Sequence, residues 1–369
     1  MKKNLAIIGA SYLQLPLIKK AKELGYITHV FAWKANDVGE KEADFFYPIS
    51  ITEIDLITDK CREIGVCGIC SIATDLGNIT VNYVADRLGL PCNTCESTRK
   101  STNKYLMRKA FEESGDPSPK SIIVDKDTDL SKLDLSFPII VKPTDRSGSR
   151  GIYKLDNKDK LKTVVNLAIE EGFEKKALIE EYVDGKEYSV EGISYNGKHH
   201  ILAVTLKYTT GAPHFIEKGH MEPAPISGNL YNKVVKVITH ALDTLEIKNS
   251  ASHSEIKIDD DENIKIIEIG SRMGGDCIGS DLVYYSTGID YLKAVINVAC
   301  GIEPDLDSNK TTCVSEVRYI LNEDDLKEFY RIKKEEPWKI LRIADDKHFS
   351  LIGKTTDSSN RAGCYIIKR

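Results

Sequence analysis

Short apolar stretches alternate with helical stretches through the first 95 residues of the chain. The first apolar stretch, residues 5–8, ends at Gly9, and a helical stretch follows it to Leu24. Strands joined by crossover helices lie parallel, with helices on both faces of their sheet. The alternation therefore predicts a parallel, doubly wound α/β domain. Its other predicted strands are 27–33, 67–72 and 90–92, and its other predicted helices cover 54–64 and 81–88.

The turn after the first predicted strand bears on whether this domain binds a dinucleotide. Such sites use a glycine-rich pattern, and this segment keeps only Gly9 while carrying the bulky Tyr12 and Gln14. We therefore expect a tight strand-to-helix turn, with an NAD-dependent oxidoreductase as a weaker alternative.

The pattern changes near residue 100. A basic helix is predicted over 100–114, and the segments beyond it are mostly hairpin-like, with a strong turn signal at 195–198. Helices are predicted over 232–245 and 289–300, and the last part, from Val314, indicates strands around one helix. This second part is predicted to be α+β, built on antiparallel sheet.

Charge and apolar content exclude several classes of protein. The 51 basic and 56 acidic residues give a net charge of −5, so no broad basic surface for nucleic acid is expected. No run of about 18 apolar residues is present, which predicts a protein without a membrane span. The apolar run after Lys3 is interrupted at Gln14 and Pro16, too early for a signal peptide, so we expect a cytoplasmic protein.

The nine cysteines, an odd number, favour reduced thiols over a disulfide framework. Cys67 with Cys70, and Cys92 with Cys95, form two C-x-x-C pairs that raise a zinc site as an alternative. The first pair lies in a predicted strand, where residues three apart point to opposite faces. Packed core thiols are therefore the favoured interpretation.

A predicted hairpin brings two carboxylates together. A four-residue turn pairs Asp259 with Ile264, and that register places Glu255 directly opposite Glu268 on one face of the sheet. Facing carboxylates repel, so the pair requires a cation between them, and Mg²⁺ prefers such oxygen ligands. A slipped register or a solvent-exposed face is the alternative.

The residues after this hairpin suit an anion held by the same metal. Arg272 follows Glu268 by four residues and can reach an anion that the metal bridges. The pair Gly274-Gly275 allows backbone N–H groups to approach a carboxylate or phosphate closely.

Two upstream segments suit a nucleotide. Lys142 lies near the end of an apolar strand and precedes the small, N–H-rich loop 145–151, which suits phosphate oxygens. A strand beginning at Ala177 leads through a turn to a second strand that carries Glu187. This arrangement can present backbone groups to a purine edge and a carboxylate to ribose hydroxyls.

In this order, the motifs resemble the ATP-grasp superfamily over residues 1 to about 305. The resemblance includes Thr102-Asn103-Lys104-Tyr105 and Glu180-Glu181-Tyr182-Val183. Within the superfamily the chain is most similar to L-amino acid ligases and related carboxylate–amine ligases. Residues 215–224 resemble their substrate-side loop, and His253-Ser254-Glu255 follows as in that group.

The resemblance implies a fold of three parts. Residues 1–97 would form a Rossmann-like parallel α/β domain, and residues 98–305 an ATP-grasp domain with antiparallel sheets. Residues 306–369 would form a small C-terminal subdomain that completes or covers the grasp.

The resemblance also implies a role for each motif. The residues that would bind ATP are Lys104 and Lys142 at the phosphates, Ser147, Gly148, Ser149 and Gly151 in the loop that closes over them, Glu180 with the backbone of Glu181 and Val183 at adenine, and Glu187 at ribose. Glu255 and Glu268 would hold one or two Mg²⁺ ions, for which Mn²⁺ can substitute. Arg272, His220 and Gly275 would contact the transferred phosphoryl group and the acyl phosphate.

Gly270 departs from the superfamily pattern, because many members carry an asparagine there as a further metal ligand. A second Mg²⁺ would then be held more by phosphates and water than by the protein. Asp276 indicates either a polar or cationic substrate group or a helix N-cap before Ile278. Cys277 is expected to be a packed thiol.

Residues and resemblance together predict an ADP-forming carboxylate–amine ligase. A carboxylate would attack the γ-phosphate of ATP, and an amine would then displace phosphate from the acyl phosphate. The expected partners are small-molecule carboxylate and amine substrates, with a homodimer as the assembly. Weaker alternatives are an enzyme that phosphorylates bicarbonate, a D-alanine ligase-like enzyme and a non-catalytic nucleotide sensor.

Overall fold

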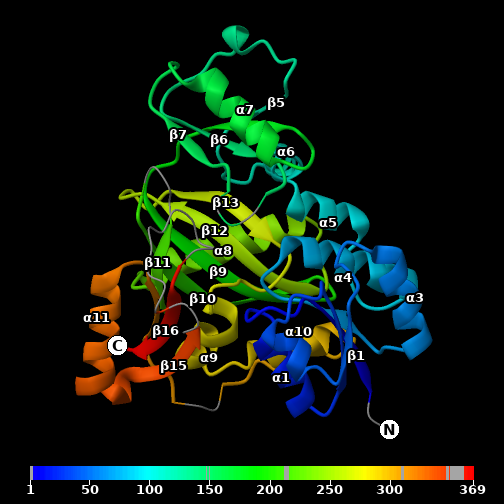
Figure 1. Cartoon of the computed structure of the whole chain (residues 1–369). Helices are drawn as coiled ribbons and strands as arrows, with labels where there is room; N and C mark the ends of the chain where they lie inside the picture. The colour runs from blue at the N-terminus through cyan, green and yellow to red at the C-terminus, as the bar shows by residue number, and fades with distance from the viewer. Residues whose placement is uncertain are drawn as a thin grey trace.

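The computed structural model describes residues 3–146, 148, 150–211, 216–308, 311–345, 349 and 361–369. These residues form one four-stranded parallel sheet, one eight-stranded antiparallel sheet and one four-stranded antiparallel sheet. In Figure 1 the small antiparallel sheet and helix α7 (Leu161–Glu171) form an upper lobe above a body that contains the other two sheets. The predicted combination of parallel and antiparallel sheets is confirmed. None of the helices in the described ranges has the length and apolar character that a membrane crossing requires.

The parallel sheet has the strand order β3-β2-β1-β4. The turn after its first strand is tight, because Gly9 has φ of 96° and the Gln14 side chain fills the turn, accepting a hydrogen bond from the Ser11 N–H (3.1 Å). The prediction of a tight turn is thus confirmed. The elements of this region are β1 (Asn4–Ile8), α1 (Leu15–Glu23), β2 (Ile27–Phe31), α2 (Val38–Glu42), β3 (Phe45–Tyr47), α3 (Ile54–Ile64), β4 (Ile69–Cys70) and α4 (Asp75–Leu88).

One prediction for this sheet is wrong, and one of its strands was not predicted. Residues 90–92 form no strand, because the backbone beyond Pro91 is bonded by side chains, the Asn93 N–H donating to Oδ1 of Asn82 (2.8 Å). The sheet instead gains β3, which pairs with β2 from His29 opposite Phe45. A strand of three residues is too short to show an alternation in the sequence.

The predicted basic helix over 100–114 is two helices, α5 (Cys95–Thr102) and α6 (Lys104–Ser114). They are separated at Asn103, whose side-chain oxygen caps α6 by accepting a hydrogen bond from the Leu106 N–H (3.1 Å). The break matters for the site, because it places Lys104 in the first turn of α6 with its N–H bonded to the carbonyl of Thr144 (2.8 Å).

The eight-stranded sheet has the order β13-β12-β9-β10-β11-β14-β16-β15, so the C-terminal strands extend the sheet that the hairpins begin. Both predicted hairpins and the C-terminal strands around one helix are confirmed. Its strands are β9 (Lys186–Tyr195), β10 (Lys198–Thr209), β11 (Glu217–Glu222), β12 (Ser250–Ile258), β13 (Ile264–Gly270), β14 (Ser315–Ile320), β15 (Ile340–Asp345) and β16 (Gly363–Lys368). The helices of this part are α8 (Gly228–Thr244), α9 (Val283–Thr287), α10 (Tyr291–Ala299) and α11 (Glu323–Glu335).

The upper lobe has its own apolar core. Val141 and Ile179 from the sheet pack with Val165 and Ala168 of α7, and all four side chains are buried. The strands of the lobe, in sheet order, are β5 (Ser121–Val124), β8 (Ala177–Glu181), β6 (Ile139–Pro143) and β7 (Tyr153–Leu155).

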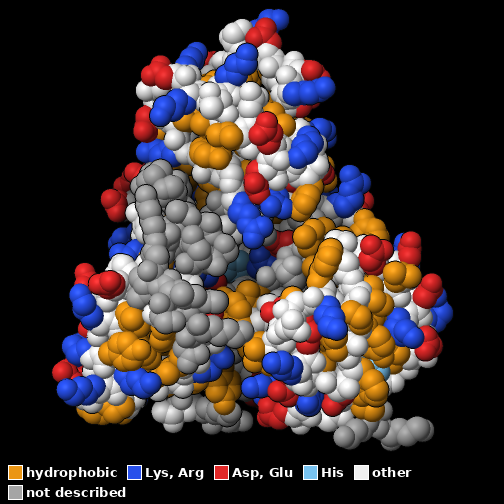
Figure 2. Space-filling model, viewed as in Figure 1, with side chains coloured by type: hydrophobic (Ala, Val, Ile, Leu, Met, Phe, Trp, Pro, Cys, Tyr) orange, Lys and Arg blue, Asp and Glu red, His pale blue; other side chains and the backbone are white. Residues whose placement is uncertain are grey.

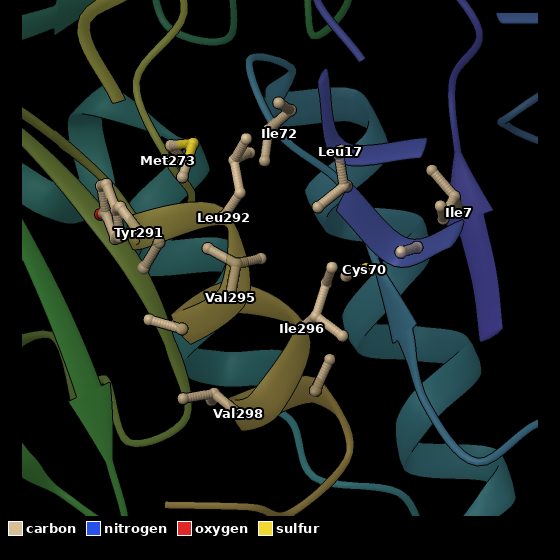
Figure 3. Close-up of a cluster of buried hydrophobic side chains, with 14 of the residues drawn as sticks. Ile7, Leu17, Cys70, Ile72, Met273, Tyr291, Leu292, Val295, Ile296 and Val298 are labelled. Carbon is tan, nitrogen blue, oxygen red and sulfur yellow. The ribbon is translucent and has the colours of Figure 1, made fainter. Parts of the chain in front are cut away.

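Helix α10 joins the parallel sheet to the eight-stranded sheet. In Figure 3 its residues Val295 and Ile296 lie among buried apolar side chains that include Ile7 of β1 and Leu17 of α1. From the first turn of the helix, the Tyr291 hydroxyl donates to a backbone carbonyl of β9. A helix buried on most sides is typical of a shared core, so α10 fixes the two sheets relative to each other.

The buried carboxyl of Glu222 is expected to make stability depend on pH. Glu222 is fully buried on β11 beside the hydroxyls of Thr205 and Ser286, and burial raises its pKa to about 8. Between about pH 4.5 and 8 the folded protein keeps a proton that the unfolded chain releases, so the free energy of unfolding falls as pH rises, by at most about 1.4 kcal/mol per pH unit. We expect Glu222→Gln to flatten this dependence in denaturant unfolding at pH 5 and pH 8. An unchanged pH dependence of the free energy of unfolding in Glu222→Gln would contradict the raised pKa of Glu222.

Candidate active site

The two carboxylates predicted to face each other do so, since Glu255 of β12 and Glu268 of β13 are cross-strand partners. The turn differs from the prediction, because Ile258 pairs with Ile264, and that register alone would put the two glutamates on opposite faces. Ile267 is an extra residue in β13, a β-bulge that restores the facing register. Both carboxylates line one cavity. The bulge therefore creates the pair of like charges.

Two buried lysines contact these carboxylates. Lys207 of β10 contacts Glu255, and its Nζ lies 2.8 Å from Oε1 of Glu187. Lys104 of α6 places its Nζ 2.6 Å from Oε1 of Glu268. Lys104 and Glu187 were predicted from the sequence, and Lys207 was missed. Its signal was a single lysine that follows an apolar run within a strand.

The charges around Glu255 keep it ionised. Burial alone would raise its pKa, but Lys207 and His253 hold that pKa well below its ordinary value. Burial would likewise lower the pKa of Lys207, but Glu187 and Glu255 raise it well above its usual range. An ionised carboxylate opposite a second one, both lining a cavity, supplies the hard oxygen ligands that Mg²⁺ prefers. The donor set fits the predicted metal.

His253 adds a further positive charge beside Glu255. Its Nδ1 bonds to the buried carboxylate of Glu191, and its Nε2 lies 3.6 Å from Oε1 of Glu255. Burial would lower the pKa of His253, but Glu191 raises it to about 9, so the ring is an imidazolium at neutral pH. The sequence showed His253 only as part of a motif and gave it no role.

A buried triad of charges lies beneath the same cavity. Lys142 places its Nζ 2.6 Å from Oε2 of Glu180, and Arg108 places its Nε 2.8 Å from Oε1. All three side chains are at most 5% exposed. Each carboxylate oxygen of Glu180 therefore contacts a cation. The sequence indicated Lys142 but not Arg108. These cations hold the pKa of Glu180 below its ordinary value although burial opposes them.

The predicted adenine segment forms one wall of the cavity. Glu181, Tyr182 and Val183 line it, and Lys257 donates to the Val183 carbonyl (3.0 Å) while lying over the Tyr182 ring. Figure 2 shows the hollow between the upper lobe and the body, with basic side chains at its edge. Further apolar lining comes from Pro119, Ile140, Ile152 and Ile267.

The predicted phosphate loop is described in part. Gly148 lines the cavity. Gly151 does not, and instead lies at φ of 68° against the side chains of Glu171 and Pro143. Ser147 and Ser149 fall outside the described residues.

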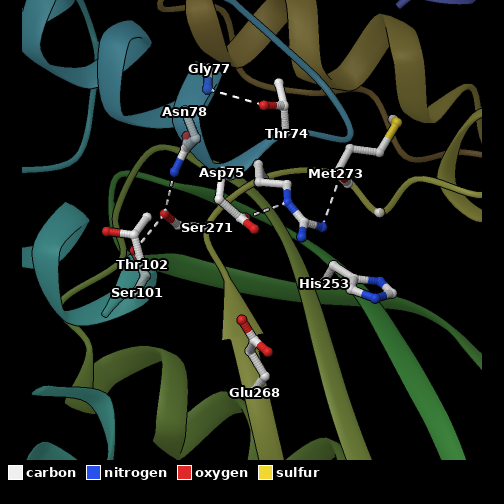
Figure 4. Close-up of polar contacts among 12 residues, drawn as sticks. Thr74, Asp75, Gly77, Asn78, Ser101, Thr102, His253, Glu268, Ser271 and Met273 are labelled. Atoms are coloured by element: carbon white, nitrogen blue, oxygen red, sulfur yellow. Dashed lines mark hydrogen bonds and ion pairs between the residues drawn. The ribbon is translucent and has the colours of Figure 1, made fainter. Parts of the chain in front are cut away.

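Residues 271–273 are fixed by the N-terminal region, as Figure 4 shows. Nε of Arg272 donates to Oδ1 of Asp75 (2.8 Å) at the start of α4. The side-chain amide of Asn78 donates to the hydroxyl of Ser271 (2.9 Å). The N–H of Ala73 donates to the carbonyl of Met273 (3.1 Å). The predicted Arg272 is thus oriented by Asp75, which the sequence did not single out although it follows a strand of the parallel sheet.

A second cavity, of about 560 Å³, adjoins the first and shares Glu255 and Arg272 with it. His220 and Gly275, both predicted to contact the transferred group, line this second cavity. His220 is fully buried, and within the described part of the chain neither of its ring nitrogens has a hydrogen-bond partner. A buried imidazole whose ring nitrogens make no hydrogen bond is suited to bind a ligand.

Asp276 lies in the second cavity and is not a helix N-cap. The short helix η2 (Ile278–Leu282) has Cys277 at that position, without a side-chain cap, and Cys277 is buried as expected. The Asp276 carboxylate pairs with Arg361 (2.6 Å) and lies 3.8 Å from Nε2 of His220. Its pKa is well below its ordinary value, because Arg361 outweighs the effect of burial. Arg361, which the sequence did not reveal, is therefore already the cationic partner of Asp276. A cationic substrate group at Asp276 would share the carboxylate with Arg361.

Comparison with known proteins identifies a domain that carries part of these residues. Residues 135–280 match the family described as the ATP-grasp domain. Alanine–anticapsin ligase from Bacillus subtilis is 24% identical over 309 residues, which cover 74% of this chain and 65% of that protein. The chain thus spans less than two thirds of the length of this relative.

Two solved structures share the fold across the whole chain. L-amino acid ligase from Bacillus licheniformis superposes with a TM-score of 0.82 at 21% identity, covering 100% of this chain and 93% of that one. N5-carboxyaminoimidazole synthetase from Staphylococcus aureus, complexed with ADP, gives a TM-score of 0.80 at 15% identity, with 100% and 94% covered. These structures show the shared fold, and the family match over residues 135–280 confirms the resemblance to the ATP-grasp superfamily that the motifs predicted.

Proposed function

We propose that the protein is an ADP-forming ligase that joins a small carboxylate, such as an amino acid, to an amine. One observation carries the proposal: Glu255 and Arg272 lie on the wall shared by two adjoining cavities. A phosphoryl group that passes from a nucleotide in one cavity to a substrate in the other must cross this wall.

The first cavity suits Mg-ATP. Its apolar wall and the 181–183 segment would receive adenine, Glu187 would bind ribose, and Lys104 and Lys142 would meet the phosphates. Glu255 and Glu268 would hold Mg²⁺, which neutralises phosphate charge and aligns the γ-phosphate. On binding, Lys104 and Lys142 would exchange their contacts with Glu268 and Glu180 for phosphate oxygens.

The second cavity suits the carboxylate substrate. Its oxygen would attack the γ-phosphate in line, forming an acyl phosphate and ADP, and an amine would then attack the acyl carbon and release phosphate. Phosphorylation is needed because oxide is a very poor leaving group. The substrate carboxylate is itself the nucleophile, so the protein supplies none. Arg272, His220 and the N–H of Gly275 would stabilise the charge on the transferred group.

Nucleotide and phosphate release with Mg-ATP, with and without pooled L-amino acids, tests the proposal. We expect ADP and phosphate to appear only when amino acids are present, and deconvoluting the pools identifies the substrates. Release of AMP and pyrophosphate would overturn the acyl-phosphate mechanism. Release that depends on bicarbonate instead would favour the carboxylase alternative. The fold shared with N5-carboxyaminoimidazole synthetase is the reason to test for it.

Asp75 is expected to act as a positioning residue for Arg272. We expect Asp75→Asn to lower kcat by about 10- to 100-fold with little change in the KM for ATP, because a charge-assisted hydrogen bond contributes about 1.5–3 kcal/mol. Asp75→Glu should recover part of the rate. Asp55→Asn is the control, since that exposed carboxylate pairs with Arg87 far from the cavities. An equal rise in the KM for ATP would show that Asp75 acts on nucleotide binding instead.

A further inference from the structure

Two cysteine side chains lie in contact between the parallel sheet and helix α10. The Sγ atoms of Cys67 and Cys300 are 3.8 Å apart, although the residues are 233 positions apart in the chain. Cys67 lies shortly before β4, and Cys300 directly follows α10. Both side chains are partly exposed. The ligase chemistry proposed above uses neither of them.

The close approach is a property of the local sequence. Gly68 follows Cys67, and a Cβ at Gly68 would lie 2.7 Å from the carbonyl oxygen of Ala299 and 2.8 Å from Sγ of Cys300. Both contacts are shorter than real Cβ atoms make, so only glycine lets this backbone lie against the end of α10. The absence of a side chain at position 68 is what brings the two thiols together.

We infer that Cys67 and Cys300 form an oxidisable thiol pair that closes to a disulfide between the parallel sheet and the end of α10. A disulfide has an S–S length of about 2.05 Å, so the sulfur atoms must approach by less than about 2 Å. Partial exposure gives a small oxidant access to the pair.

The pair is also suited to the chemistry. The hydrogen bond from Cys300 lowers the pKa of Cys67 to about 7, and the ammonium of Lys3 acts in the same direction. Cys67 is thus about half thiolate at neutral pH, and the thiolate is the nucleophile. Cys300, whose pKa is raised by this same contact, remains a thiol.

With hydrogen peroxide as the oxidant, the reaction has two steps. The Cys67 thiolate attacks one peroxide oxygen, the O–O bond breaks, and hydroxide leaves and takes up a proton as the first water. The sulfur of Cys300 then attacks the resulting sulfenic acid, the S–O bond breaks, and the Cys300 proton leaves with the hydroxide as the second water. Two thiols lose two electrons, and one peroxide gains them.

Peptide mapping of the folded full-length protein tests this inference. After dilute peroxide, we expect a mass loss of about 2 Da, from two hydrogens, and a non-reduced tryptic peptide joining 63–87 to 294–310. Cys67→Ser and Cys300→Ser should each abolish that peptide, whereas Cys313→Ser should keep it. Because the closed loop is long, the oxidised protein should also unfold several degrees higher, and reduction should reverse the shift.

Two results would overturn the inference. One is oxidation of Cys67 to a sulfenic or sulfinic acid without a cross-link to residues 294–310. The other is a cross-link that persists in Cys67→Ser, since the same tryptic peptide contains Cys70. These readouts are independent of turnover, so they separate failure of this inference from failure of the proposed ligase.

Discussion

Replacing Arg272 by alanine is expected to lower the ligase rate by a factor on the order of 10²–10³, which is typical when one stabilising contact to a developing charge is lost. The guanidinium lies on the wall shared by the two cavities. Asp75 raises the pKa of Arg272 further above its usual range although burial opposes it, so the positive charge is present at every working pH. Steady-state ADP release under saturating ATP measures the loss.

The main effect of Arg272→Ala should be on turnover. Because the Ser271 hydroxyl and the Met273 carbonyl keep their own bonds to the N-terminal region, the loop should stay in place, and the thermal unfolding temperature should fall only by the loss of the ion pair with Asp75. Arg331→Ala is the matched control, since this exposed arginine on α11 pairs only with neighbouring glutamates among the described residues. Near-normal turnover by a folded Arg272→Ala protein would refute the assignment of the site.

The bonds around Arg272 give the parallel sheet a role in the site, although no described residue of that sheet lines the cavity proposed for the nucleotide. The end of β4 leads through Ala73 to Asp75, and these residues bond to Met273 and Arg272. Helix α10 anchors the same sheet to the eight-stranded sheet through a shared core. Because the sheet is fixed at both places, the orientation of Arg272 depends on a domain that binds no nucleotide in the proposal.

The hairpin of Glu255 and Glu268 shows what the sequence could establish. The register set by an expected four-residue turn predicted the facing pair, and the structure confirms the pair. The turn itself is one residue longer than predicted, and the bulge at Ile267 compensates. A bulge depends on neighbours outside its own strand, and here the Ile267 carbonyl accepts a hydrogen bond from Arg108 of α6. That contact cannot be predicted from the sequence of the hairpin alone.

The residues that were missed share a physical reason. Lys207, Asp75 and Arg361 act through partners 48, 197 and 85 positions away, so no local pattern shows their pairing. Several expectations also remain predictions: the domain limits at 97 and 305, the ligand contacts of each site residue, a homodimer and a cytoplasmic location. Of these, the ligand contacts and the homodimer depend on molecules outside this chain.

Replacing Glu180 by glutamine is expected to destabilise the fold by about 3–5 kcal/mol, because it leaves buried cations without their partner. Lys142 and Arg108 each contact one oxygen of Glu180, and all three side chains are nearly inaccessible to water. Denaturant unfolding at pH 7 measures the loss. The pKa of Glu180 is lowered in the folded protein, so its contribution is present above the unfolded pKa of about 4.5 and is lost as pH falls below it.

Glu181→Gln is the matched control, since Glu181 is the next residue on β8 but is 39% exposed and lies 3.5 Å from Lys265. An exposed ion pair contributes at most about 1 kcal/mol, so this variant should unfold close to the wild type. Glu180→Gln should also lose part of the acid sensitivity of the wild type, because the group that would take up the proton is gone. Equal stability of the two variants would mean that water or a shifted proton relieves the buried charges, and that the triad contributes little to holding the upper lobe at the cavity.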